Sequence, residues 1–251
     1  MTTGDVLLAG RDLVMRFGGL AAVDGVTVEL RRGEVHAVIG TNGAGKSTLV
    51  HMLSGELVAT SGRVLLGDDD ITAWPQPKRA RAGIGRSYQR TNVFAELTVF
   101  ENARLSAQAA HARPFAVWES ARRCAASSGI AERALAAAGL SAEADRPAAA
   151  LSHGGKRQLE IAMCLATEPT VLLLDEPLAG MGAEETERML ALLAELKRDH
   201  AILLVEHDMD AVFRVADRIT VMVNGAVIAS GDPAAIRVDP QVRVEYLCED
   251  D

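Results

Sequence analysis

The chain has 251 residues, of which 49% are hydrophobic, enough for one large domain or two small ones with a substantial core. Its net charge of −8 argues against nucleic acid as the main partner, because phosphate backbones select basic surfaces. Its apolar runs fall far short of the roughly 18 residues that span a bilayer, and its N-terminus lacks the basic-then-apolar order of a signal peptide.

The first elements in chain order are strands. Residues 6–17 and 26–30 predict two strands, joined by turns at Gly18-Gly19 and Asp24-Gly25, so a small antiparallel sheet is expected first. Val35 to Ile39 is a short apolar run typical of a buried strand.

A glycine-rich loop, residues 40–47, follows that strand and fits the pattern G-x-x-x-x-G-K-[ST]. Residues 47–54 then predict a helix that ends at Gly55, so the strand–loop–helix context argues against a chance match. Such a loop wraps a phosphate with backbone N–H groups at a helix N-terminus. Lys46 would reach the β- and γ-phosphates, and Ser47 would offer its hydroxyl to Mg²⁺. The chain is therefore predicted to bind a nucleoside triphosphate.

The middle of the chain predicts helices. Thr98-Val99-Phe100-Glu101 is a capping box, so a helix should begin there. The alanine-rich stretch from there to about Gly139 is predicted to break at Arg113-Pro114 and at Ser127-Ser128-Gly129. This block is either filler between strands or a subdomain inserted in an α/β core, and its length favours the subdomain.

The remaining elements alternate between strand and helix, which indicates an α/β fold with a mainly parallel sheet. A helix should end at Glu168-Pro169, and the elements expected after it are a doubly buried strand at 171–174, a helix at 184–197, a strand at 201–205 and a hairpin turning at Asn224-Gly225 between 219–223 and 226–229.

The cysteines and the basic residues bear on two further points, the redox environment and a possible basic patch. Cys124, Cys164 and Cys248 have no metal-binding spacing and cannot all pair, so a reducing cytosol is the simplest interpretation. Despite the acidic total, a local basic patch is possible where five basic residues gather around residues 83–85: Lys78, Arg79, Arg81, Arg86 and Arg90.

The acidic pair Asp175-Glu176 ends the buried strand 171–174. A carboxylate at the carboxyl end of a parallel strand beside a phosphate loop holds Mg²⁺ in P-loop ATPases, and Asp175 would do so. Glu176 would lie near the γ-phosphate and orient or deprotonate the attacking water. The alternative is an exposed acidic turn, which the preceding phosphate loop disfavours.

Several further segments share one order along the chain, and with them the chain resembles the ATP-binding subunits of ABC transporters over nearly its whole length. They are Arg16-Phe17-Gly18-Gly19, Tyr88-Gln89, Leu151-Ser152-His153-Gly154-Gly155, Asp175-Glu176-Pro177, Ala179-Gly180-Met181-Gly182 and Val205-Glu206-His207-Asp208. The resemblance implies a P-loop NTPase core with an N-terminal antiparallel β-subdomain and an inserted helical subdomain. It divides a single nucleotide-binding domain, 1–251, into a core (1–90 and 166–251) and a helical part (91–165).

The resemblance also implies ATP and Mg²⁺ as cofactors and a role for each matching residue. The catalytic group is Glu176, His207 and Gln89; the metal group is Ser47, Gln89 and Asp175; the nucleotide group is Phe17 (on adenine), Val23, Asn42, Gly43, Gly45, Lys46, Ser47, Thr48, Ser152 and Gly154. Lys46 of one subunit would face Ser152 of a second subunit, with ATP between them. The second subunit would be an identical copy, giving a homodimer, or a paralogue. Hydrolysis would release this clamp.

Finer details resemble the importer branch for branched-chain amino acids, whose relatives also import amides and urea. These are residues 17–23, 83–91, 206–209 and 244–247. Lipopolysaccharide-export ATPases rank second, because they usually lack so long a helical insert. A soluble ABC-type regulator would carry two fused nucleotide domains or a long coiled coil, and a GTPase would carry an N-K-x-D motif; neither is visible.

The importer resemblance implies permease subunits, indirectly a solute-binding protein, and a peripheral position on the cytoplasmic face of the membrane. The permease would dock near residues 89–98, where Val93 and Phe94 either form an apolar interface or pack under the helical block. Besides Thr41, which replaces a common proline of the phosphate loop, three residues depart from the family pattern. His153 and Gly155 alter the L-S-G-G-Q signature, and Gly182 replaces a common aspartate that couples the two sites.

Overall fold

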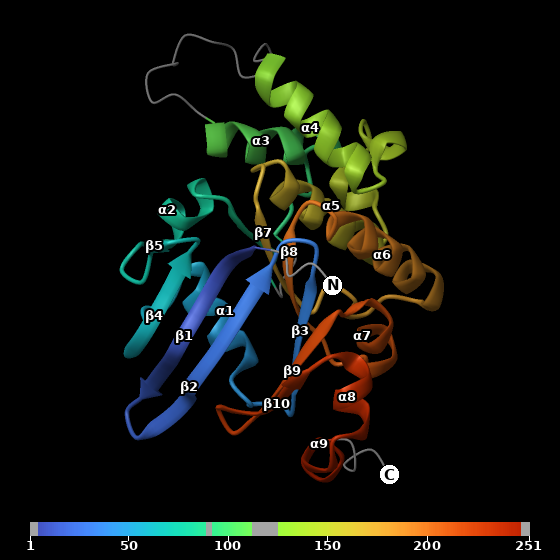
Figure 1. The fold of residues 1–251 in the computed structure, drawn as a ribbon. Coiled ribbons are helices and arrows are strands. Elements are labelled where there is room, and N and C mark those ends of the chain that lie inside the picture. Colours follow the sequence, from blue (N-terminus) through green and yellow to red (C-terminus); the bar gives the residue numbers. More distant parts are fainter. Residues whose placement is uncertain (1–4, 89–91, 112–124, 247–251) are drawn as a thin grey trace.

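Two β-sheets form the core of the chain (Figure 1), in a computed structural model that describes residues 5–88, 92–111 and 125–246. The larger sheet has the strand order β10-β9-β3-β8-β7-β6. Its neighbouring strands are parallel except β9 and β10, which pair antiparallel at one edge. Its strands are β3 (Val35–Gly40), β6 (Ile84–Arg86), β7 (Val171–Asp175), β8 (Ala201–Val205), β9 (Arg218–Val223) and β10 (Ala226–Gly231). Every residue of β3, β7 and β8 is buried, as expected for central parallel strands.

The smaller sheet is antiparallel, with the order β2-β1-β4-β5. It is built from β1 (Val6–Phe17), β2 (Leu20–Arg31), β4 (Ser61–Leu66) and β5 (Asp69–Asp70). Helix α1 (Lys46–Ser54) lies between the two sheets, and one apolar cluster joins it to both through buried residues such as Leu49, Leu13 and Leu203. The phosphate loop therefore starts from a well-packed centre.

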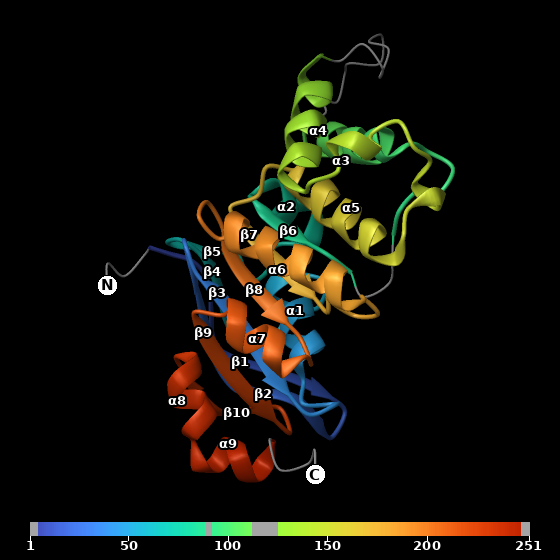
Figure 2. The same cartoon turned by 90° about the vertical axis from the view of Figure 1, so that its right-hand side faces the viewer.

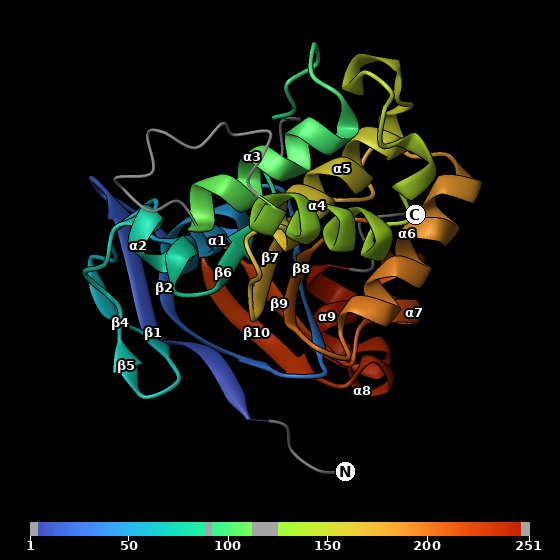
Figure 3. The same ribbon diagram turned by 90° about the horizontal axis from the view of Figure 1, so that it is seen from above.

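Three helices gather at one end of the molecule and form what we call the helical block: α3 (Val99–His111), α4 (Ala125–Ala137) and α5 (His153–Leu165) (Figure 2). They share an apolar cluster that includes Val99, Leu135 and Leu159. The other face of α5 sends Ile161 and Leu165 into the cluster beside the larger sheet. Helix α5 is thus the element that connects this block to the core, as the view from above also shows (Figure 3).

The remaining helices belong to the core. They are α2 (Gln76–Arg81), α6 (Ala183–Leu196), α7 (Met209–Val215), α8 (Pro233–Val238) and α9 (Pro240–Glu245). Among the described residues, no helix combines the length and the apolar character needed to cross a membrane.

Most of the predicted elements are confirmed. The α/β class with a mainly parallel sheet and an antiparallel N-terminal sheet is present. The capping box exists as hydrogen bonds: Glu101 N donates to Thr98 Oγ1 at 3.0 Å, and Thr98 N donates to Glu101 Oε2 at 3.2 Å. The hairpin turns at Asn224 and Gly225, whose φ values of 50° and 84° fit a tight hairpin turn.

Two local predictions are wrong. The expected turn at Asp24-Gly25 is a bulge within β2: the pairing steps from Leu13↔Val26 to Met15↔Val23, and Gly25 takes up the extra residue with a φ of 68°. The expected break at 127–129 lies inside α4, because packing of that helix outweighs the low helix propensity of serine and glycine. Arg113-Pro114 lies outside the described residues, and the division of the chain into subdomains stays a prediction.

The suggested basic patch is also wrong for two of its members. Arg79 is 1% exposed, and its guanidinium donates to four carbonyl oxygens, those of Met52, Leu53, Thr72 and Trp74. The Arg86 guanidinium is buried against Glu56 and the Ser54 hydroxyl. Both arginines hold α1 and its surroundings together, and Arg90 lies outside the described residues.

Candidate functional site

The phosphate loop runs from the end of β3 into α1, and glycines are required where it is tightest. A Cβ atom on Gly45 (φ 98°) would lie 2.1 Å from the Ala22 carbonyl oxygen, and one on Gly40 would lie 1.9 Å from that of Met222. The neighbouring strands β2 and β9 therefore leave room only for bare backbone. Asn42, Gly43 and Thr48 lie in the same loop or at the start of α1, as predicted from their order.

Lys46 is only 6% exposed and turns back into its own loop. Its Nζ donates to the carbonyl oxygens of Gly40, at 2.6 Å, and Thr41, at 2.9 Å. Burial lowers the pKa of the ammonium, while the carboxylates of Glu176 and Asp175 act in the opposite direction. The cation is thus held at the centre of the loop, and the carboxylates at the end of β7 (Asp175) and directly after it (Glu176) are close enough to influence it.

Asp175 is the last residue of β7 and is 2% exposed. Its backbone N–H donates to Ser87 Oγ at 3.3 Å, and its Oδ1 is buried with no hydrogen-bond partner. Burial, followed by the nearby charge of Glu176, raises the pKa of this carboxyl group. An orphaned buried carboxylate oxygen beside a phosphate loop suits a cation that is supplied with the ligand.

Glu176 leaves the strand with a left-handed backbone, at a φ of 51°. Its N–H still donates to the Val205 carbonyl oxygen of β8 at 2.9 Å, so the sheet holds this strained residue in place. Its Oε1 lies 2.9 Å from Nε2 of His207, the second residue after β8. The structure therefore brings together Lys46, Asp175, Glu176 and His207 at the carboxyl ends of three adjacent strands.

Glu206 is a residue of this site that sequence reasoning did not single out. It is 3% exposed, its Oε1 accepts a hydrogen bond from Leu178 N at 2.7 Å, and its Oε2 accepts one from His207 N at 3.2 Å. Burial raises the pKa of Glu206 to about 7. It ties the backbone of His207 to the loop after Glu176. An acidic residue directly after a buried parallel strand was the available signal.

The signature segment forms the N-terminus of α5, and we call Ser152–Gly155 the signature turn. Ser152 caps the helix by accepting a hydrogen bond from Gly155 N at 3.1 Å, and its hydroxyl donates to Glu185 Oε1 at 2.7 Å. His153 Nε2 lies 2.9 Å from the Ala179 carbonyl oxygen. This turn is therefore fastened to the loop after β7 and to the first turn of α6. Glu185 is the second residue that sequence reasoning missed.

The predicted adenine contacts differ in exposure. Phe17, the last residue of β1, is 50% exposed, and Leu20 across the turn is 67% exposed. Val23 is fully buried in the core, so its side chain offers no surface to a ligand in this conformation. Phe17 is the stronger candidate for stacking on a base.

Gln89 lies outside the described residues, but both flanks of its segment are held by α5. Arg157 Nη1 donates to the Tyr88 carbonyl oxygen at 2.9 Å, and Glu160 Oε1 accepts a hydrogen bond from Asn92 N at 2.8 Å. Arg157 and Glu160 also pair with each other at 2.9 Å and are both buried. Helix α5 therefore holds the described residues on both sides of the segment that contains Gln89.

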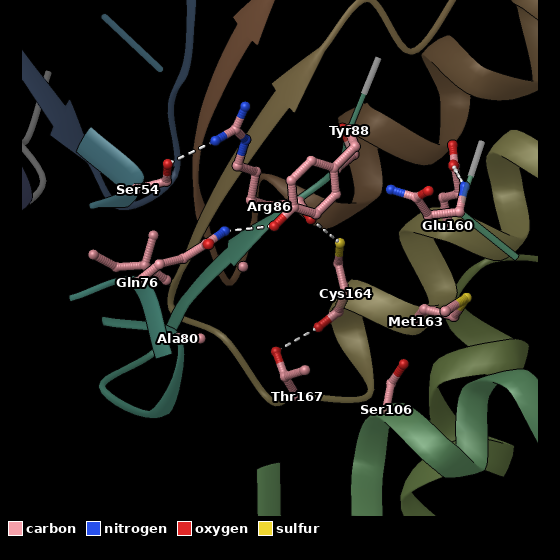
Figure 4. Close-up of a pocket in the computed structure, with 14 residues that line it drawn as sticks. Ser54, Gln76, Ala80, Arg86, Tyr88, Ser106, Glu160, Met163, Cys164 and Thr167 are labelled. Carbon is pink, nitrogen blue, oxygen red and sulfur yellow. Dashed lines mark hydrogen bonds between the residues drawn. The ribbon is translucent and has the colours of Figure 1, made fainter. Parts of the chain in front are cut away.

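A cavity of about 240 Å³ lies between strand β6 with the residues that follow it, helix α2 and helix α5. Figure 4 shows Tyr88 and Gln76 on one side and Met163 and Cys164 of α5 on the other. Cys164 Sγ donates to the Arg86 carbonyl oxygen at 2.9 Å, and burial raises the pKa of this thiol to about 12, so it is an unreactive wall of the cavity. Within the described ranges, no cluster of three His, Cys, Asp or Glu residues could hold a metal.

Comparison with known proteins gives consistent matches. Residues 23–179 match the family model described as ABC transporter. The high-affinity branched-chain amino acid transport ATP-binding protein LivG of Escherichia coli (strain K12) is 42% identical over 97% of this chain and 98% of its own length. The corresponding protein BraF of Pseudomonas aeruginosa is 40% identical over 94% of this chain and 96% of its own.

Solved structures agree. A nucleotide-free ATP-binding cassette from an ABC transporter superposes with a TM-score of 0.86 at 31% identity, covering 96% of this chain and 98% of that one. The ADP conformation of an ATP-binding cassette of an ABC transporter gives a TM-score of 0.83 at 30% identity, with the same coverage.

Proposed function

The chain belongs to the ABC transporter family of ATP-binding proteins, and we propose that it is the ATP-hydrolysing subunit of an importer for branched-chain or related hydrophobic amino acids or amides. The importer assignment rests on the near-complete match with LivG and BraF. The ATPase chemistry rests on one geometric observation: the Glu176 carboxylate and the His207 imidazole, 2.9 Å apart, at the strand ends beside the phosphate loop.

ATP binding begins at the phosphate loop. Lys46 exchanges the carbonyl oxygens of Gly40 and Thr41 for oxygens of the β- and γ-phosphates, which are better acceptors because they are charged. The N-terminus of α1 adds its positive field. Phe17 covers the base from the edge of the smaller sheet.

The residues present fit Mg²⁺, which supplies charge neutralisation on the phosphate oxygens. Ser47 and Asp175 would hold it together with the phosphates, and Gln89 is a further proposed ligand. The unpartnered Oδ1 of Asp175 supports this. Mg²⁺ characteristically binds through one or two protein ligands plus substrate phosphates and water.

Hydrolysis then requires a positioned water and a base. Glu176 accepts a proton from the water as its oxygen attacks the γ-phosphorus, and the bond from that phosphorus to the bridging oxygen of ADP breaks. His207 donates a hydrogen bond from Nε2. Its acceptor is the Glu176 carboxylate in this structure, and it would be the γ-phosphate when ATP is bound. The left-handed backbone of Glu176 is the kind of stored strain found at such sites.

A second subunit completes the site. Ser152 and Gly154 face the γ-phosphate bound to a partner chain, either an identical copy or a paralogue. ATP that touches both chains shifts the equilibrium toward the closed dimer by its differential affinity, and hydrolysis reverses the shift. The exposed position of Ser152 at the N-terminus of α5 supports this arrangement, because an exposed helix N-terminus favours an anion.

Permease subunits dock at the cavity between the core and the helical block (Figure 4). Phe94, two residues after Asn92 of the cavity lining, offers an apolar contact near it: the residue is 56% exposed, while its backbone N–H and carbonyl are both held by Asn102. Its neighbour Val93 packs on the helical block, so only one of the two apolar residues is free for a partner. The chain thereby lies peripherally on the cytoplasmic face of the membrane, with a solute-binding protein acting on the far side.

Uptake by cells tests this function. Deleting the gene should abolish high-affinity uptake of radiolabelled leucine, isoleucine and valine, and wild-type protein should restore it. The variant Glu176→Gln should be made and membrane-bound yet fail to restore uptake. Normal uptake of these amino acids and of short amides in the deletion strain would refute the importer assignment, and membrane association that survives loss of the permease would favour a soluble regulatory ATPase.

A further inference from the structure

One carboxylate, that of Glu185, lies between the N-termini of two helices. Within α6 it accepts a hydrogen bond from the N–H of Gly182, the residue that caps this helix. Across to α5 it accepts the hydroxyl of Ser152 at 2.7 Å and the N–H of Gly154. Figure 2 shows α5 and α6 running beside each other. The carboxylate therefore fills the signature turn.

This position favours a negative charge. The hydroxyl of Ser152, followed by the two backbone N–H groups, holds the pKa of Glu185 below its usual value. Both helix N-termini add positive field at the same point. The donors that Glu185 uses on α5, a hydroxyl and a backbone N–H, are those assigned above to the γ-phosphate of a partner's ATP.

We propose that Glu185 is an internal substitute for the γ-phosphate, an autoinhibitory contact that occupies the signature turn and must withdraw before ATP on a second subunit can engage Ser152 and Gly154. This inference rests on the proposed dimer closure. It adds a step to it: each subunit releases its own carboxylate when it accepts the partner's phosphate.

Space and charge both require the withdrawal. A Cβ atom on Gly154 would lie only 2.5 Å from Cδ of Glu185, so the carboxylate already fills the room in front of that backbone. A phosphate at the same donors would also meet a like charge within a few ångströms.

Arg188 offers the displaced carboxylate a new partner. It lies three residues further along α6, on the neighbouring turn, and its charge already acts on Glu185. Arg188 borders the same surface hollow as Ser152 and Gly155, and it now pairs at 3.6 Å with Glu184, which is solvent-exposed. A change of the Glu185 rotamer toward Arg188 opens the signature turn without moving either helix.

The contact raises the ATP concentration that closure requires. A subunit is competent to accept the partner's phosphate only in the fraction of time that Glu185 is withdrawn, and the apparent affinity for closure falls by that fraction. Removing the carboxylate of Glu185 should therefore favour the closed dimer.

The test uses the full-length chain carrying Glu176→Gln, which slows hydrolysis so that closed dimers accumulate. Mg-ATP is titrated and the dimer fraction is followed by analytical ultracentrifugation. Adding Glu185→Ala should lower the ATP concentration at half-dimerisation by roughly threefold to tenfold, the range for loss of a charge-assisted contact near water. The matched control is Glu195→Ala, which removes an exposed charge from the same helix without touching Ser152 or Arg188 and should shift the midpoint less than about twofold.

A second variant guards against damage to the helix cap. Glu185→Gln keeps the shape of the side chain and a carbonyl oxygen for Ser152 but loses the charge, so its midpoint should lie between those of the parent and Glu185→Ala. ATP affinity of the monomer, measured with a fluorescent nucleotide, should be the same in all variants.

The outcomes distinguish a failure of the autoinhibitory contact from a failure of dimer closure. A midpoint that stays unchanged or rises in both Glu185 variants would show that this residue only caps α6 and would overturn the autoinhibitory contact. A parent that binds ATP but forms no dimer at any ATP concentration would overturn dimer closure of this chain itself, and with it the inference built on closure.

Discussion

The phosphate loop and the signature turn both present donors at a helix N-terminus, but they satisfy those donors differently. In the phosphate loop, Lys46 bonds to two neutral carbonyl oxygens of its own backbone. In the signature turn, Ser152 bonds to the charged Glu185. A phosphate displaces neutral acceptors readily, whereas a carboxylate competes with it on equal terms. The phosphate loop is thus ready for ATP in a single subunit, while the signature turn has an internal rival.

The two regions also differ in how they are held. The phosphate loop grows out of β3, whose residues are all buried between β8 and β9. The signature turn is exposed and is fastened by side-chain contacts of Ser152 and His153. Exposed side-chain contacts exchange more easily than a buried strand shifts. The catalytic half should be rigid, and the signature half should be the part that adjusts.

The largest expected effect tests whether ATP hydrolysis depends on Glu176, beside the phosphate loop. Glu176→Gln should lower the ATPase rate by about 10²–10⁴-fold, or roughly 3–5 kcal/mol of barrier, because the amide accepts no proton. ATP binding should survive, since Lys46, Ser47 and Asp175 are untouched, and the variant should accumulate as an ATP-bound dimer in size-exclusion chromatography. The control Glu184→Gln makes the same chemical change on exposed surface. Wild-type turnover in Glu176→Gln would remove this residue from the mechanism.

The next effect compares the two regions directly. Lys46→Ala should weaken ATP binding to the monomer by roughly a hundredfold, about 3 kcal/mol, because the phosphates lose a buried cation. Ser152→Ala should leave this affinity unchanged, because in the proposed dimer Ser152 contacts the phosphate that is bound to the partner. Fluorescent-nucleotide titration at a protein concentration that keeps the chain monomeric measures both. An equal loss in Ser152→Ala would break the distinction between a self-sufficient phosphate loop and a signature turn that acts on a second subunit.

The strands and the loop of the phosphate-loop region could be predicted because their patterns lie in short contiguous segments, and the roles of their residues stay predictions. A buried strand followed by Gly40–Ser47, and another followed by Asp175-Glu176, specify both the residues and the sheet edge where they meet. His207 could be placed by the same logic. Parallel strands fix the geometry, so local pattern suffices.

The signature region depended on contacts that no local pattern contains. Glu185 lies 33 residues after Ser152, and the two meet only because α5 and α6 pack together. Gly182 and Glu185 form half of a capping box, which signals a helix start but not a second helix within reach. Arg79 was misjudged for the same reason: its charge suggested a surface patch, while four carbonyl oxygens that bury it come from α1 and from residues 72–74.

The third prediction concerns the residue that links the two regions. Glu206 holds His207 on one side and Leu178, on the path to α6, on the other. Its pKa is about 7 in the folded chain, against an ordinary value of 4.5. A carboxyl group whose pKa is raised by folding contributes stability below pH 4.5 and loses it as the pH rises to 7. Charged neighbours Glu176 and Asp208 act in the same direction.

Glu206→Gln should remove this pH dependence. The free energy of unfolding of the variant, relative to wild type, should rise by about 2–3 kcal/mol between pH 4.5 and pH 7.5. Urea unfolding at several pH values measures it. His36, whose pKa burial lowers to about 4, acts oppositely between pH 4 and 6.5, but it is present in both proteins and cancels in the difference. Parallel curves for the two proteins would show that Glu206 does not titrate in this range.

The smallest effect lies at the edge of the phosphate-loop region, at the base. Phe17→Ala should weaken ATP binding by about 1 kcal/mol, roughly fivefold, because its ring is half exposed and the phosphates provide most of the affinity. Stacking recognises the face of a base and not its edges, so GTP should lose the same factor. Titrations of both nucleotides measure this, with Val58→Ala as a control that truncates an exposed apolar side chain on another part of the surface. A loss confined to ATP would mean that Phe17 positions a group that reads the edge of adenine, and unchanged affinity for both nucleotides would show that the base binds elsewhere.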